Sequence, residues 1–139
     1  MAGPPFSLRK LDHVVLRVSD LQASLAFYVE ALGCTMEKQQ ANIGLYQLRA
    51  GDSLIDLVPI EEPLGRAGGA APAVEGRNLD HFAIQIAPFD LGAIRAHLRA
   101  IDVEIGEIGQ RYGAEGTGPS VYIRDPDGNV VELKGPPER

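Results

Sequence analysis

The sequence contains the same short pattern twice, half a chain apart. Residues 11–18 read Leu-Asp-His-Val-Val-Leu-Arg-Val, and residues 79–86 read Leu-Asp-His-Phe-Ala-Ile-Gln-Ile. Each copy has Leu-Asp-His, then two apolar or small residues, one aliphatic, one polar and one aliphatic residue. A repeat of this kind indicates that the fold is built from two similar units.

A second pair of matching segments follows the first pair in the same order. These segments are LYQLRAGDSLIDL and VYIRDPDGNVVEL, at residues 45–57 and 121–133. Aligned on their leucine ends, they match Tyr46 with Tyr122 and Asp56 with Glu132. Each acid then stands ten residues after its tyrosine. Two matches in the same order, at both ends of each half, are hard to attribute to chance.

Both halves show one order of predicted elements. A strand with alternating side chains comes first, at about 11–18 and again at 79–87. A helix follows, capped by Ser19 or Asp20 in the first half and by Asp90 in the second, with apolar residues at helical spacing. Three short strands complete each half, and a strong turn signal, Asp-Pro-Asp-Gly-Asn at 125–129, separates the last two.

The predicted fold is therefore α+β, with two βαβββ modules that form a curled mixed sheet around a cleft. The 139 residues are the size of a single domain. Module one covers about 8–60, a Gly-, Ala- and Pro-rich linker covers 61–78, and module two covers about 79–135. Residues 106–119 contain five glycines, so we interpret them as a candidate lid over the cleft.

Composition excludes several classes of partner. A net charge of −6 argues against nucleic acid, and no apolar run approaches the 18 residues that a membrane span needs. The start of the chain lacks the pattern of a secretory signal, and one cysteine rules out an intramolecular disulfide. We expect a soluble cytoplasmic protein. Any metal site would be built from nitrogen and oxygen ligands.

The repeat places two histidines and two carboxylates at equivalent positions. On each first strand the histidine faces away from the apolar side, which should pack on the helix. If a pseudo-twofold axis relates the halves, His13, Asp56, His81 and Glu132 converge. Imidazole and carboxylate together suit a first-row divalent metal. Glu132 also lies in an apolar stretch, where an uncompensated carboxylate is costly.

These segments resemble the vicinal oxygen chelate superfamily, which includes glyoxalase I, fosfomycin-resistance proteins, extradiol dioxygenases and bleomycin-resistance proteins. LDHVVLRVSDLQASLAFYVEALG and SVYIRDPDGNVVEL carry the resemblance most specifically. The resemblance implies paired βαβββ modules around a metal cleft, with His13, His81 and Glu132 as ligands of Zn, Ni, Mn, Fe or Co. Asp56 falls on the fourth position. Because Asp is one methylene shorter than Glu, its roles as ligand, hydrogen-bond acceptor to a ligand and catalytic base stay open.

The remaining candidates concern the substrate. Tyr46 and Tyr122 are expected to line the cleft, with packing as the alternative, and Arg111 and Arg124 are candidates for binding an anionic group. Glu132 and Asp56 are the candidate proton-transfer groups. We interpret His97 as a surface residue and Cys34 as a half-buried structural thiol.

Three functions follow from the resemblance. The first is a metal-dependent enzyme of the glyoxalase and fosfomycin-resistance type, in which the metal chelates two neighbouring oxygens of a small substrate. Its chemistry is isomerase, epimerase or lyase chemistry, or addition of a nucleophile. The second is a non-haem iron dioxygenase of the extradiol type. The third is a bleomycin-resistance-like binding protein without catalysis. A small-molecule partner and a homodimer are expected in each case.

Overall fold

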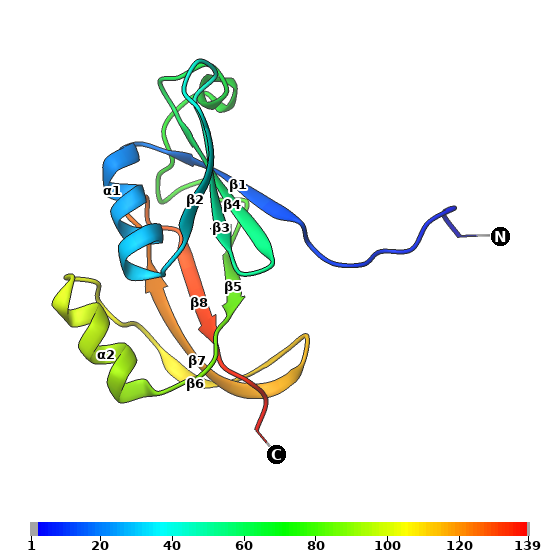
Figure 1. The fold of residues 1–139 in the computed structure, drawn as a ribbon, viewed down its shortest axis with the longest axis vertical. Helices are drawn as coiled ribbons and strands as arrows, with labels where there is room; N and C mark the ends of the chain where they lie inside the picture. Colours follow the sequence, from blue (N-terminus) through cyan, green and yellow to red (C-terminus); the bar gives the residue numbers. More distant parts are fainter. Residues whose placement is uncertain (1–2, 139) are drawn as a thin grey trace.

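The computed structural model describes residues 3–138, and Figure 1 shows its two groups of strands. The first group, module one, contains β1 (His13–Val18), α1 (Leu21–Leu25), the π-helical segment η1 (Ala26–Ala31), β2 (Thr35–Gln40), β3 (Leu45–Ala50) and β4 (Ser53–Pro59). A short 3-10 helix, η2 (Gly65–Gly68), lies in the connection. The second group, module two, contains β5 (His81–Gln85), α2 (Leu91–Ala100), β6 (Ile108–Gly113), β7 (Gly116–Arg124) and β8 (Val130–Lys134).

Each module holds one four-stranded sheet, and the two sheets have the same topology. The strand orders are β1-β4-β3-β2 and β5-β8-β7-β6. In each sheet the first strand pairs in parallel with the last, and the other pairs are antiparallel. The predicted α+β fold of two βαβββ modules is confirmed. The two sheets stay separate in the chain and do not close into one.

The helices begin where the sequence predicts. The Asp20 carboxylate accepts a hydrogen bond from the backbone N–H of Ala23 (3.1 Å), and Asp90 does the same for Ala93 (3.1 Å). Each acid thereby satisfies a backbone donor that the first turn leaves free. The first helix continues beyond Leu25 as the π-helical turn η1, and Gly33 follows it with φ +83°.

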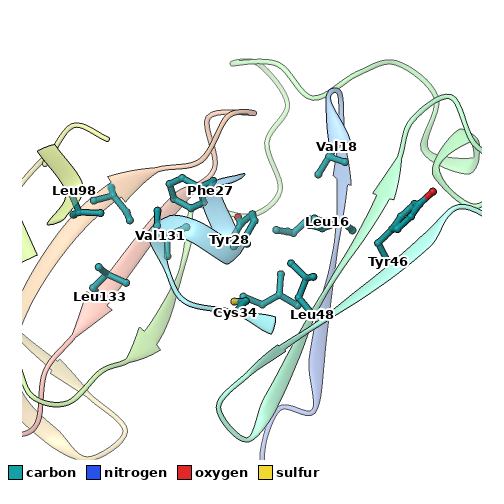
Figure 2. Close-up of a cluster of buried hydrophobic side chains, with 14 of the residues drawn as sticks. Leu16, Val18, Phe27, Tyr28, Cys34, Tyr46, Leu48, Leu98, Val131 and Leu133 are labelled. Carbon is teal, nitrogen blue, oxygen red and sulfur yellow. The ribbon is translucent and has the colours of Figure 1, made fainter. Parts of the chain in front are cut away.

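One hydrophobic core joins the two modules. It combines apolar side chains of both sheets with Phe27 and Tyr28 of the first helix. Figure 2 shows these two rings between Val131 of the second sheet and Leu16 of the first. The apolar face of each sheet is thus covered by helices, which leaves the histidine face of each first strand open. On β1 this open face carries His13 and Val15, and Val15 is 52% exposed.

The segment that was predicted as a lid is instead a β-hairpin. Residues 108–113 form β6, and residues 116–124 form β7, with Gly116 at φ +119° in the turn between them. The abundance of glycine concealed the strand pairing, which joins six consecutive residue pairs from 108–121 to 113–116.

No helix among the described residues is long and apolar enough to cross a membrane.

Arg17 holds part of the connection between the modules. Arg17 donates from Nε to the Gly65 carbonyl (2.8 Å), and from its two Nη atoms to the carbonyls of Ala70 (2.9 Å) and Gly69 (2.5 Å). All of these oxygens lie in the segment that the sequence marks as an aperiodic linker. Since its guanidinium is occupied by carbonyl groups, Arg17 fixes this segment over the end of β1.

Candidate metal centre

The two repeated histidines are held in the same way. His13 Nδ1 lies 2.7 Å from Asp12 Oδ2, and His81 Nδ1 lies 2.7 Å from Asp80 Oδ2. A carboxylate in this position favours the tautomer with its proton on Nδ1 and leaves Nε2 as a lone-pair donor. The tautomer is inferred from these contacts. The sequence left Asp12 and Asp80 without a role, although the repeat of Leu-Asp-His contained the signal.

In module two the free nitrogen of the histidine faces a buried carboxylate. His81 Nε2 lies 3.3 Å from Glu132 Oε1, and Glu132 is 5% exposed. The hydroxyl of Ser120 donates to the other oxygen of Glu132, and the Tyr122 ring meets the His81 ring edge-on, with centroids 5.5 Å apart. When Asp80 holds the Nδ1 proton, Nε2 and Oε1 are two acceptors that face each other. A proton or a metal cation between them removes this conflict.

Module one carries a weaker version of the same arrangement. Asp56 is 2% exposed. Its Oδ2 accepts a hydrogen bond from Gln47 Nε2 (3.1 Å), while Oδ1 has no partner among the described residues. The hydrogen bond with Asp12 raises the pKa of His13 above its ordinary value, and the charge of Asp56 adds to this effect. A buried carboxylate oxygen without a partner is unusual in a folded protein, and a bound water or ion is a common reason for one.

The four candidate ligands do not meet within one chain. His13 and Asp56 belong to the first sheet, and His81 and Glu132 belong to the second. Across residues 3–138, no group of three or more potential ligands is close enough to hold a metal. The reason lies in the packing: each module buries its apolar sheet face in the shared core. The predicted convergence of all four side chains therefore does not occur inside a single copy.

Tyr46 and Tyr122 are not equivalent in the structure. Tyr122 pairs with Glu132 across the β7–β8 ladder, whereas Asp56 pairs with Gln47 across β3–β4. Asp56 stands nine residues after its cross-strand partner, whereas Glu132 stands ten residues after its own, so an alignment on the tyrosines is shifted by one residue and changes the face of the sheet. Tyr46 lies in the core, 7% exposed, and its hydroxyl donates to Glu62 (3.2 Å).

The two candidate arginines lie near Tyr122. Arg111 Cζ is 5.5 Å from the centre of the Tyr122 ring, and its Nη2 is 3.5 Å from Glu107 Oε2. A hydrogen bond with Tyr122 and nearby carboxylates raise the pKa of Arg111. Arg124 is exposed and shares a cavity lining with His81 and Tyr122. Both guanidinium groups thus stand on the side of the second sheet that carries the histidine.

Two residues set aside by the sequence have structural roles. His97 Nε2 lies 2.9 Å from the Ala31 carbonyl, so it links α2 to the end of the first helix. Cys34 is 4% exposed, which makes it more deeply buried than predicted. Ser120 and Gln47 were missed, because nothing in a strand sequence tells which hydroxyl or amide will oppose a buried carboxylate.

Comparison with known proteins shows the family of this chain. A family model described as the glyoxalase/bleomycin resistance protein/dioxygenase superfamily matches residues 10–133. The protein belongs to this superfamily. It is 34% identical over 126 residues to a glutathione transferase, FosA, of Serratia marcescens, covering 91% of this chain and 80% of that protein.

Solved structures of the superfamily have the same fold. A virulence protein of Salmonella typhimurium is 26% identical, and superposes with a TM-score of 0.71 over 94% of this chain and 99% of that one. A fosfomycin-resistance protein, FosX, of Listeria monocytogenes is 20% identical, with a TM-score of 0.68 over 93% and 94% of the two chains. Superfamily members generally depend on divalent metals. The donor set here, with two oriented imidazoles and two buried carboxylates, fits such an ion chemically.

Proposed function

We propose that the protein is a metal-dependent enzyme of the glyoxalase and fosfomycin-resistance type. The observation that carries this proposal is the contact between His81 Nε2 and Glu132 Oε1. Asp80 holds the other ring nitrogen, and Glu132 is buried without a cationic side chain among its described partners. The pair is therefore prepared for a cation. The unpartnered Oδ1 of Asp56 supports the same reading for the other half of the centre.

Two copies of the chain would supply one complete centre. His13 and Asp56 of one copy and His81 and Glu132 of the other form the set of four ligands, and the open faces of the two first strands allow this approach. Closed twofold symmetry would create two equivalent centres in a homodimer. This arrangement explains why each chain presents two half-sites rather than one whole site.

The bound ion would act as a Lewis acid toward two neighbouring oxygens of the substrate. The chain's own residues would orient the metal ligands and supply positive charge beside them. Asp12 and Asp80 fix the imidazoles, and Ser120 fixes one oxygen of Glu132. Arg111, stacked against Tyr122, and the exposed Arg124 supply positive charge for an anionic group. Either Asp56 or Glu132 would carry the proton that the reaction moves.

The relatives point to addition of a nucleophile as the reaction class to test first. The FosA relative is a glutathione transferase, and the FosX structure is that of a fosfomycin-resistance protein. When a thiol such as glutathione adds to an epoxide substrate, the sulfur bonds to a ring carbon and the bond from that carbon to the ring oxygen breaks. The released oxygen takes the proton that the thiol gave up. Glyoxalase-type isomerisation is the alternative within the same site.

Elemental analysis of protein purified without added metal tests the metal dependence. We expect stoichiometric divalent metal in the unaltered protein, loss of metal in His13→Ala and His81→Ala, and full retention in His97→Ala, whose ring lies outside the centre. Glutathione consumption with fosfomycin, compared between metal-loaded and metal-stripped protein, tests the reaction class. Full metal content in His81→Ala would sink the proposal.

A further inference from the structure

The first residues of the described chain form an arm that leaves the body. Residues 3–12 extend away from both sheets (Figure 1). Hydrogen bonding to the body begins at Asp12, whose carbonyl accepts from the Leu54 N–H (3.2 Å). We call residues 3–11 the N-terminal arm.

The composition of the arm is unusual for a free segment. Phe6, Leu8 and Leu11 are 64%, 92% and 81% exposed. Burial of such side chains lowers the free energy of a protein, so their exposure is unfavourable. Arg9 and Lys10 stand between them, and residues 3–11 contain no acid. The arm is therefore both apolar and basic, in a chain whose net charge is −6.

A cavity between the first helix and module two has the complementary chemistry. Its volume is about 1030 Å³, and His81 is one of its lining residues. Five exposed acids line it, namely Glu30, Asp80, Asp102, Glu104 and Glu107. Apolar side chains line much of the remaining wall, among them Phe27, Ile101, Val103 and Ile105, and Arg124 is the one Arg or Lys side chain among the described residues that line it. A basic segment with spaced apolar side chains matches this lining in both charge and hydrophobicity.

The place of the arm in the chain connects these two features. The arm ends two residues before His13, and an extended chain advances by at most about 3.6 Å per residue, so Leu8 lies within ~18 Å of His13. In the proposed shared centre, His13 of one copy stands beside His81 of the other. His81 lines the cavity, so the arm of the first copy enters the dimer at the edge of the second copy's acidic cavity.

We propose that the N-terminal arm of one copy binds in the acidic cavity between the first helix and module two of a second copy. Leu8 and Leu11 contact the apolar wall, and Arg9 and Lys10 face the acids. This inference rests on the proposed function, because the shared centre is what brings the arm to the cavity. It adds an interaction surface that the metal ligands do not require, and it places the arm as one wall of the site beside His81.

Disulfide trapping between two different chains tests the contact. In a Cys34→Ser background, Leu8→Cys protein is mixed with Val103→Cys protein, allowed to exchange and mildly oxidised. We expect a cross-linked dimer that contains one chain of each kind. The matched control uses Val74→Cys in place of Val103→Cys. It is the same substitution, at a side chain that is 89% exposed in the connection between the modules. The control should cross-link much less.

Charge reversal in the arm provides the second measurement. Arg9→Glu/Lys10→Glu should slow the cross-linking on the order of tenfold, because the arm then repels the acids. Equal trapping at Val74, or none at Val103, overturns the proposal. If the protein is dimeric and holds metal but gives no such cross-link, the arm proposal fails and the shared centre stands. A monomeric, metal-free chain overturns both.

Discussion

Tyr28 and Asp125 join the two modules through a buried hydrogen bond. The Tyr28 hydroxyl donates to Asp125 Oδ2 at 2.6 Å, although 97 residues separate them in the sequence. Tyr28 is fully buried and Asp125 is 4% exposed. Burial and the neighbouring carboxylate raise the pKa of Tyr28 far above its ordinary value, so the hydroxyl stays protonated and keeps donating. Asp125 belongs to the turn that the sequence predicts between the last two strands.

Tyr28→Phe should destabilise the protein by about 1.5–3 kcal/mol, the range for a hydrogen bond to a charged group. The ring stays in the core, so the loss reports on the hydroxyl. Urea unfolding followed by circular dichroism measures the change, and Tyr112→Phe, at a side chain that is 85% exposed, is the control. Equal stability of the two variants would contradict this role.

Asp80→Asn should weaken metal binding by about 10- to 100-fold, which is the usual cost of losing the partner that orients a histidine ligand. Asp12→Asn should do the same, because the repeat gives His13 an equivalent partner at the same 2.7 Å. Competition with a chromophoric chelator measures the affinity. Glu75→Gln, at an exposed acid in the connection between the modules, serves as the control. Unchanged affinity in both asparagine variants would mean that these acids do not orient the ligands.

The Cys34 thiol should resist alkylation in the native protein. Burial raises its pKa above the ordinary value of 9.0. The reactive thiolate is therefore scarcer than usual at every pH below the raised pKa. The rate of alkylation should climb as the pH rises toward that pKa. Mass spectrometry after iodoacetamide treatment measures the rate. We expect it to be slower than in urea by on the order of a hundredfold. Rapid native alkylation at pH 7 would show that the thiol is accessible.

The sequence predicted the fold well because the repeat and its side-chain alternation are local patterns. The two sheets, both aspartate caps and the turn at 125–129 follow from short segments. The hairpin at 106–119 was missed, because cross-strand pairing leaves little trace in a stretch with five glycines. The wrong equivalence of Tyr46 and Tyr122 has a similar cause. The spacing between each acid and its cross-strand partner differs by one residue between the modules, and an alignment of the two motifs does not reveal this difference.

The residues of the candidate centre could be predicted from the sequence, but how they come together could not. The repeat identifies the His13–His81 pair and the two acids, and each acid lies buried in its strand. Whether four such groups meet within one chain depends on how two modules pack, and this is decided by long-range contacts such as Phe27 against the second sheet. The oriented contact of His81 with Glu132 depends on side-chain geometry that no spacing rule contains.

A mixing experiment tests the central claim, that two copies share each metal centre. His13→Ala and His81→Ala proteins are purified separately, mixed in equal amounts and allowed to exchange subunits, and the metal content is measured by elemental analysis. Each variant alone has no complete centre. A mixed dimer has one, formed by His13 of one chain with His81 and Glu132 of the other. Random exchange should therefore restore about one quarter of the metal content of the unaltered protein. A mixture that fully exchanges and stays free of metal would contradict the account.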